Sequence, residues 1–214
     1  MKFKYALFDL DMTLIDSIKP LMVSANLLAE KFDLRQVTYA EVYQAEVSVP
    51  NCTFELLWQN LWGYCDSKWH EVYRDELAER EYEVMELYPT GRETLETLHK
   101  LGVPLGLASN RDYPRRALQC LGLEEFFAVV VGQMDVILPK PAPDMILKAM
   151  EQMGAAADEL LYVCDSTGDI KAASAAGGVK TFSLTTGGHS AEELRALGAW
   201  KTGDRLIEIA DFFR

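Results

Sequence analysis

The chain has 214 residues, with 33 acidic and 21 basic side chains and a formal net charge of -12. Its hydrophobic fraction of 49% is that of an ordinary globular protein, and its length suits one large domain or one domain with an insertion. The negative charge argues against binding to nucleic acid or to anionic membranes, because both favour basic surfaces. A small anionic substrate remains compatible, since a local pocket can be cationic within an acidic protein.

The sequence shows no pattern typical of an export signal or of a bilayer-spanning segment. The amino-terminal residues lack a long apolar run with a small-residue cleavage site, and the longest apolar stretches are far too short to cross a membrane. The cysteines, Cys52, Cys65, Cys120 and Cys164, form no CxxC pair, which favours free thiols over disulfides or a zinc site. We therefore expect a soluble, cytoplasmic protein.

Short apolar runs alternate with helical patterns along most of the chain. The runs are continuously apolar, as in parallel strands covered on both faces, and they span residues 5–10, 103–109, 128–131, 160–164 and 179–184. The helical patterns span residues 90–101, 113–121, 142–153 and 169–176. This alternation predicts βαβ units and an α/β fold.

Residues 18–87 interrupt this alternation. They contain no convincing strand, and their helical patterns span residues 24–32, 39–46, 54–61 and 67–87. We interpret the segment as a helical insertion after the first strand, where open α/β sheets bind their ligands and where an insertion can act as a lid. The predicted domains are a core of residues 1–16 and 89–214, and an inserted helical cap of residues 17–88.

Polar residues stand at or near the carboxyl ends of the predicted strands. They are Asp9, Asp11, Ser109, Asn110, Lys140, Asp165 and Asp169. If the strands are parallel, these ends converge on one edge of the sheet.

Each of these residues also has an ordinary structural interpretation. Asp165 and Asp169 are common residue types in turns and at helix N-caps, and a lone lysine such as Lys140 is usually solvated. If every one of these residues had only its ordinary structural role, their convergence on one edge of the sheet would be a coincidence. A divalent cation accounts for the carboxylates, because hard oxygen ligands suit Mg²⁺ and the cation offsets their repulsion. Lys140 and Ser109 then suit a phosphate group.

Four short motifs resemble those of the haloacid dehalogenase (HAD) superfamily of phosphohydrolases. DLDMT at residues 9–13, SN at 109–110, KP at 140–141 and CDSTGD at 164–169 occur in the order of that superfamily. The chain looks most similar to the phosphoglycolate phosphatase and β-phosphoglucomutase branch. The resemblance implies an α/β fold, with a Rossmann-like parallel-sheet core and an inserted α-helical cap.

The resemblance also implies roles for the catalytic residues. Asp9 would attack phosphorus and form an aspartyl-phosphate. Asp11 would protonate the leaving alcohol and then deprotonate the hydrolytic water. Lys140 would steady the phosphoryl group and the Asp9 carboxylate. The Mg²⁺ ligands would be Asp9, the Asp11 backbone carbonyl and Asp165, with Asp169 completing or supporting that shell.

Substrate contacts follow from the same resemblance. Ser109, Asn110 and Lys140 would bind the phosphate or substrate, and Thr13 would help to fix the loop by hydrogen bonding. Arg111 would either touch the substrate or pair with Asp112 or another acid, and the sequence leaves these alternatives open.

Two residues depart from the pattern of the superfamily, and neither removes a catalytic group. Met12 stands where glycine is usual, so it requires an allowed backbone conformation or lines the pocket entrance. Cys164 also replaces a frequent glycine, and we expect a small buried residue rather than a nucleophile.

The resemblance implies a Mg²⁺-dependent phosphatase of a small phosphorylated metabolite, such as 2-phosphoglycolate or a sugar phosphate. One alternative is a phosphomutase, whose cap must hold a bisphosphate intermediate. Another is a catalytically silent HAD binding protein, which would have no need of an intact set of Asp9, Asp11, Lys140 and Asp165. The resemblance is compatible with a monomer or a homodimer.

Overall fold

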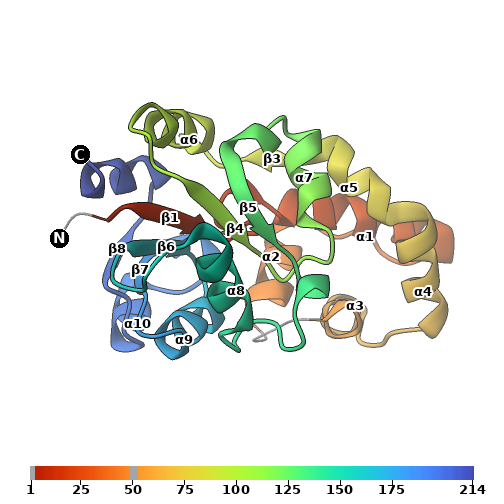
Figure 1. The fold of residues 1–214 in the computed structure, drawn as a ribbon. Coiled ribbons are helices and arrows are strands. Elements are labelled where there is room, and N and C mark those ends of the chain that lie inside the picture. Colours follow the sequence, from red (N-terminus) through yellow and green to blue (C-terminus); the bar gives the residue numbers. More distant parts are fainter. Residues whose placement is uncertain (1–2, 49–52) are drawn as a thin grey trace. The chain divides into compact units, whose positions relative to one another are not determined.

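The computed structural model describes residues 3–48 and 53–214 (Figure 1). The chain divides into two compact units: unit 1 comprises residues 1–15 and 87–214, and unit 2 comprises residues 16–86. In the described ranges, no helix is both long and apolar enough to cross a membrane. Cys65, Cys120 and Cys164 are free thiols, and Cys52 lies outside the described residues.

Unit 1 is built on a parallel sheet, which confirms the predicted α/β fold. In its described part the sheet has six strands in the order β5-β4-β1-β6-β7-β8. Their bounds are β1 Tyr5–Phe8, β4 Leu105–Ala108, β5 Phe127–Val131, β6 Leu160–Cys164, β7 Lys180–Leu184 and β8 Lys201–Gly203. Each of the five predicted apolar runs contributes one strand. The edge strand β8 was not predicted, because its sequence, KTG, has no apolar run.

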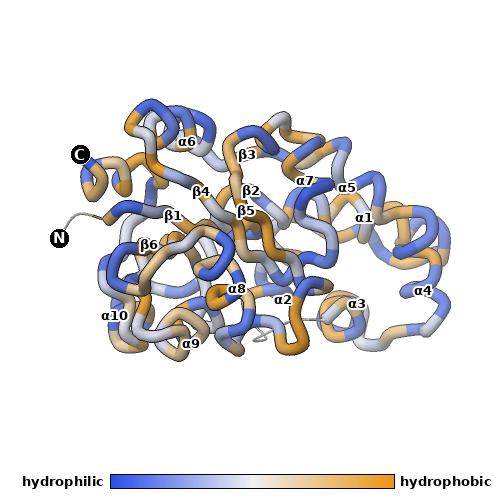
Figure 2. Tube along the Cα trace, viewed as in Figure 1, coloured by the Kyte–Doolittle hydropathy of each residue, from blue (hydrophilic) through white to orange (hydrophobic). Residues whose placement is uncertain are grey.

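Helices cover the sheet of unit 1. They are α6 Gly91–Lys100, α7 Pro114–Cys120, α8 Asp144–Met153, α9 Thr167–Ala175 and α10 Ala191–Ala196, with 3₁₀ turns at Glu124–Phe126, Gln133–Asp135, Thr185–Gly187 and Leu206–Phe212. Helices α8 and α9 lie on one face, and α6 and the carboxyl-terminal 3₁₀ turn lie on the other (Figure 1). Apolar residues on both sides explain why strands such as β5 are strongly hydrophobic along their length (Figure 2).

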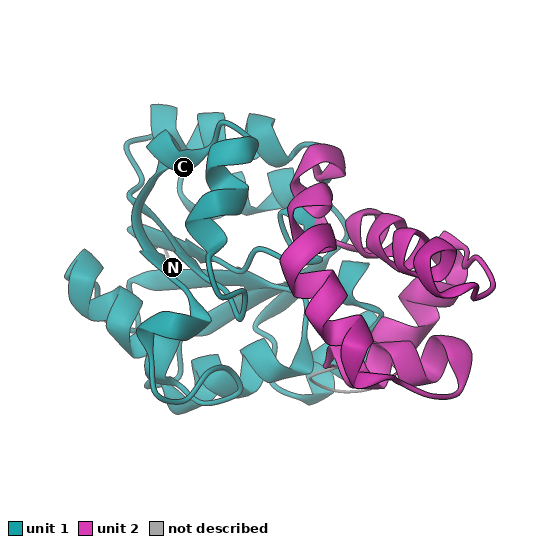
Figure 3. Cartoon of the chain, turned by 90° about the vertical axis from the view of Figure 1, so that its right-hand side faces the viewer, with its two compact units in different colours: residues 1–15, 87–214 teal, residues 16–86 magenta. Residues whose placement is uncertain are grey.

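Unit 2 is helical (Figure 3). Its helices are α1 Ile18–Phe32, α2 Tyr39–Val47, α3 Phe54–Trp62, α4 Ser67–Val72 and α5 Ala78–Val84, with a π-helical turn Tyr73–Leu77 between the last two. Its core includes the buried Trp58 and Trp69, and the rings of Phe54 and Tyr73 lie 4.1 Å apart. These aromatic contacts explain how the heavily charged stretch from Ser67 onwards remains ordered as helix.

A short two-stranded sheet forms where the chain passes between the units. It pairs β2 Ile15–Asp16 with β3 Glu86–Leu87. The prediction that residues 18–87 contain no strand was therefore wrong at its end, and the last helix stops at Val84. Strands of two residues leave no periodic apolar pattern, so the sequence carries no signal for them.

Candidate active site

Three neighbouring strands of unit 1 end at the candidate site. Strand β1 ends just before Asp9, β4 ends just before Ser109, and β6 ends just before Asp165. Because β4, β1 and β6 are adjacent and parallel, their carboxyl ends lie side by side. The three residues are 5% exposed or less. The sheet topology therefore gathers polar groups at one buried position.

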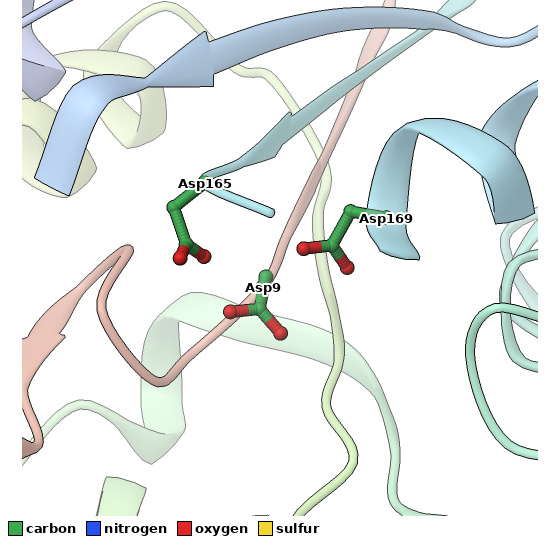
Figure 4. Close-up of side chains that lie close together, drawn as sticks. All are labelled: Asp9, Asp165 and Asp169. Atoms are coloured by element: carbon green, nitrogen blue, oxygen red, sulfur yellow. The ribbon is translucent and has the colours of Figure 1, made fainter. Parts of the chain in front are cut away.

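Asp9, Asp165 and Asp169 form a buried cluster of carboxylates, shown in Figure 4. One oxygen from each lies within 4.8 Å of the others. Asp169 reaches the cluster from the first turn of α9, where it and Ser166 form a capping box. Three converging carboxylates offer the hard oxygen ligands that suit Mg²⁺, so the residues present fit a divalent cation.

Lys140 lies against this cluster and is 6% exposed. Its Nζ lies 2.5 Å from Asp9 Oδ1 and 2.7 Å from Asp169 Oδ1. The same atom lies 3.0 Å from the Ala108 carbonyl and 3.0 Å from the Tyr162 hydroxyl. Lys140 is thus a fully engaged buried cation rather than a solvated surface lysine.

Burial and charge shift the pKa values of the cluster in opposite directions. Burial raises the pKa of Asp9 to about 7, although the Lys140 ammonium opposes this shift. Burial and the neighbouring Asp9 and Asp169 charges raise the pKa of Asp165 well above its ordinary value. For Asp169, burial is outweighed by Lys140 and by hydrogen bonds, and its pKa is lowered. A cation near Asp9 and Asp165 would favour their ionised forms.

Asp11 and Arg111 form a second, more exposed part of the site. Arg111 Nη2 lies 2.6 Å from Asp11 Oδ1, and Arg111 Nε lies 3.3 Å from Asp11 Oδ2. The side chains are 19% exposed for Arg111 and 32% for Asp11. The Asp11 carboxylate is outside the cluster of Asp9, Asp165 and Asp169. Of the alternatives for Arg111, the structure shows a pair with an acid, and that acid is Asp11.

The remaining predicted site residues contact other site residues. Thr13 is fully buried and donates a 2.7 Å hydrogen bond to Asp165 Oδ1. Asn110 exchanges two 3.1 Å hydrogen bonds with the backbone of Lys140. Ser109 is buried and donates to Asp11 Oδ2 over 3.4 Å. These contacts hold the carboxylates and the lysine in place.

Met12 adopts a left-handed backbone conformation, with φ 59°. That region is unfavourable for a residue with a Cβ, which explains why glycine suits this position. The Met12 carbonyl accepts a hydrogen bond from Thr186, and its sulfur lies 3.5 Å from the Tyr88 hydroxyl. Met12 is 7% exposed, so its side chain is packed rather than solvated.

Cys164 is a fully buried thiol whose sulfur lies 3.5 Å from the Ser183 hydroxyl. Burial raises its pKa well above the ordinary value, which keeps the sulfur protonated and unreactive. This agrees with the expectation of a small buried residue at this position.

Tyr162 is part of the site, although the sequence analysis did not single it out. Its hydroxyl donates to Asp169 Oδ1 over 2.7 Å and accepts from Lys140. The available signal was a tyrosine inside the otherwise apolar strand LLYVC, because a buried hydroxyl needs a hydrogen-bond partner.

Gly187 also supports the site. A Cβ at this position would collide with the carboxylate of Asp165. Only glycine leaves room for that side chain.

Comparison with known proteins identifies the family. The model for haloacid dehalogenase-like hydrolases matches residues 6–183. The phosphoglycolate phosphatase of Vibrio parahaemolyticus is 30% identical over 217 residues, covering 97% of this chain and 95% of that protein. A solved haloacid dehalogenase-like hydrolase from Bacteroides fragilis has a TM-score of 0.77 and 27% identity, covering 97% of this chain and 100% of that one.

A Thermotoga maritima protein named as a β-phosphoglucomutase shares the fold, with a TM-score of 0.78 and 23% identity, covering 98% of this chain and 97% of that one. The predicted resemblance to the haloacid dehalogenase superfamily is thus confirmed. The chain belongs to the haloacid dehalogenase-like hydrolase family.

Proposed function

We propose that this protein is a Mg²⁺-dependent phosphatase that hydrolyses a small phosphorylated metabolite in the cytoplasm through an aspartyl-phosphate on Asp9. The observation that carries the proposal is the Lys140 ammonium held between Asp9 and Asp169, beside Asp165. A phosphate ester is the substrate class that requires this combination of a nucleophilic carboxylate and concentrated positive charge. The relative from Vibrio, named a phosphoglycolate phosphatase, supports the same class.

The metal would be held by Asp9, Asp165 and the backbone carbonyl of Asp11, with Asp169 supporting the shell through Lys140. Mg²⁺ held by these residues would supply positive charge that offsets the negative charge of the carboxylates and of the substrate phosphate. Thr13 would keep the Asp165 carboxylate oriented through its 2.7 Å hydrogen bond.

In the first step, an Asp9 carboxylate oxygen attacks phosphorus while the bond to the ester oxygen breaks. Lys140 holds that carboxylate, and Ser109 binds the transferring group. Asp11 gives its proton to the leaving oxygen, and the alcohol departs. In the second step, Asp11 takes a proton from water as the water oxygen attacks phosphorus, which releases phosphate and restores Asp9.

The helical residues 17–88 would serve as a cap that closes over bound substrate. Closure would exclude bulk water while the aspartyl-phosphate exists, and cap residues would select among alcohol groups. Deleting the cap is expected to reduce selectivity among phosphate esters, and a deletion variant with full selectivity would contradict this role.

A panel of phosphate esters tests the proposal. Purified protein is assayed for phosphate release from 2-phosphoglycolate, sugar phosphates and an aryl phosphate, with Mg²⁺ and after metal removal. We expect Mg²⁺-dependent release that Asp9→Asn abolishes and that Asp158→Asn, at an exposed position, preserves. Hydrolysis of no ester by the wild type would refute the proposal. Isomerisation of a sugar phosphate without phosphate release would instead show a mutase.

A further inference from the structure

The two cationic side chains of the candidate site have different surroundings. Lys140 is 6% exposed and is held by Asp9, Asp169 and Tyr162, so its charge is committed to the buried cluster. The Arg111 side chain is 19% exposed and contacts Asp11, a carboxylate that is itself about one third exposed. Of these two described cations, Arg111 is therefore the more accessible to a soluble ligand.

The loop that carries Arg111 is fixed by its backbone. The Arg111 N–H donates to Ser109 Oγ over 3.1 Å, and its carbonyl accepts from the N–H of Gln133 over 3.1 Å. A Cβ at Gly132 would lie 3.1 Å from the same carbonyl, so the chain there is tightly packed. These contacts fix the Arg111 backbone beside Ser109. From there its guanidinium contacts the Asp11 carboxylate.

The position of Asp11 relates Arg111 to the substrate. To protonate the leaving oxygen, the Asp11 carboxylate must come within hydrogen-bond reach of it. The Arg111 guanidinium already lies 2.6 Å from that carboxylate. A group attached one or two bonds from the ester oxygen would therefore fall within reach of Arg111.

Charge determines which group is favoured there. The carboxylates of Asp9, Asp165 and Asp169 repel further negative charge on a substrate, so a second anionic group is favoured only where a cation faces it. A guanidinium presents a planar fork that matches a carboxylate with two hydrogen bonds. A substrate carboxylate can accept the two hydrogen bonds that the Arg111 guanidinium donates to Asp11, whereas a neutral alcohol group cannot replace them.

We infer that Arg111 is the specificity-determining receptor for a second anionic group of the substrate. The preferred substrates are phosphate monoesters whose alcohol part carries a carboxylate close to the ester oxygen. This inference rests on the proposed phosphatase function and adds a substrate class and the residue that recognises it.

A matched pair of substrates tests the inference without altering the protein. 2-Phosphoglycolate carries the carboxylate, and its amide, 2-phosphoglycolamide, has nearly the same shape without the charge. For the wild type we expect kcat/KM to be about 10- to 100-fold higher for the carboxylate, the scale of a charge-assisted pair of hydrogen bonds.

Variants then assign the preference to Arg111. In Arg111→Gln the ratio of kcat/KM for the carboxylate over kcat/KM for the amide should fall to about threefold or less. This ratio is the readout, because loss of the Arg111 contact to Asp11 lowers activity on both substrates alike. Arg111→Lys keeps the positive charge but lacks the planar guanidinium that donates two hydrogen bonds. Its ratio of kcat/KM values should lie between those of the wild type and Arg111→Gln. Arg115→Gln removes an exposed arginine of α7 and should keep the wild-type ratio.

The outcomes separate this inference from the proposed function. Equal kcat/KM for both substrates in the wild type, or an unchanged preference in Arg111→Gln, would overturn the role of Arg111 and leave the phosphatase intact. A wild type that hydrolyses neither these substrates nor any other phosphate ester would overturn the phosphatase, and this inference with it.

Discussion

The candidate site has a buried half and a partly exposed half, and each half pairs carboxylates with a cation. In the buried half, Lys140 lies among Asp9, Asp165 and Asp169, all of them 6% exposed or less. In the exposed half, Arg111 and Asp11 keep 19% and 32% of their side-chain surface in contact with solvent. Similar ion pairs thus occur in two different dielectric environments within one site.

This difference in burial indicates that the two halves of the site have different roles. Breaking a buried ion pair leaves an uncompensated charge and typically costs about 3–5 kcal/mol, whereas a fully exposed pair contributes about 0–1 kcal/mol. The part-buried pair of Arg111 and Asp11 lies between these limits. The buried half should therefore control stability and the chemistry common to all substrates. In the partly exposed half, Arg111 can exchange Asp11 for a substrate group at a lower cost in free energy. This half should therefore control the choice of substrate.

The largest expected effect comes from removing the buried cation. Lys140→Met leaves Asp9 and Asp169 without their shared partner, so we expect loss of activity on every ester. The free energy of unfolding at neutral pH should fall by about 3–5 kcal/mol, as measured by urea denaturation. Lys148→Met, on α8 outside the cluster, is the control and should change both quantities little. Wild-type stability in Lys140→Met would contradict the division between the two halves.

The pH dependence of stability tests the buried half separately. The folded pKa of Asp9 is raised to about 7, so between about pH 4 and about pH 7 the unfolded chain has lost a proton that the folded chain keeps. Metal-free protein should therefore lose stability as pH rises through this window, and the raised pKa of Asp165 acts in the same direction.

Added Mg²⁺ should offset this loss, and its stabilising effect should grow with pH, because it binds the ionised carboxylates. Thermal unfolding over a pH series, with a chelator or with Mg²⁺, measures both effects. Asp9→Asn should reduce the change in stability of the metal-free protein between about pH 4 and about pH 7. Metal-free stability that rises between about pH 4 and about pH 7 would contradict the raised pKa values.

An intermediate effect is expected from the hydroxyl that links two members of the buried half. Tyr162→Phe keeps the ring but leaves Lys140 and Asp169 each without one hydrogen-bond partner. We expect the free energy of unfolding to fall by about 1–3 kcal/mol, and kcat to fall by about tenfold with little change in KM. Tyr113→Phe, at a residue 67% exposed, is the control. A change in KM alone would mean that Tyr162 contacts substrate instead.

The smallest expected effect concerns the turn that joins the two halves. Met12 has φ 59°, so its backbone favours glycine, while its side chain is buried. Met12→Ala and Met12→Gly remove the same packing, and they differ mainly in the backbone penalty. Met12→Gly should therefore be more stable than Met12→Ala by about 1 kcal/mol, measured by urea denaturation. The reverse order would show that the turn is not strained.

The sheet could be predicted from the sequence because its main strands are buried on both faces. The run at 160–164 reads as a strand from composition alone and coincides with β6. Strand β8 and the two-residue strands β2 and β3 could not be predicted, because each is held mainly by backbone hydrogen bonds and carries no apolar pattern.

The candidate site was predictable as a set of residues but not as a set of contacts. Strand ends and motifs placed Asp9, Lys140 and Asp165 at one edge of the sheet. They could not show that Thr13 contacts Asp165 across 152 positions of sequence, or that Arg111 pairs with Asp11. Such partners depend on side-chain directions in the folded loops, which a short motif does not encode.

The central claim is covalent catalysis by Asp9, and rapid-quench mass spectrometry of the enzyme during turnover tests it most directly. With 2-phosphoglycolate and Mg²⁺, we predict a peptide that contains Asp9 and carries one added phosphoryl group. That peptide should appear within the first turnover and be absent without metal. Phosphate release at the wild-type rate by Asp9→Asn, or a phosphoryl group on another residue, would contradict the account.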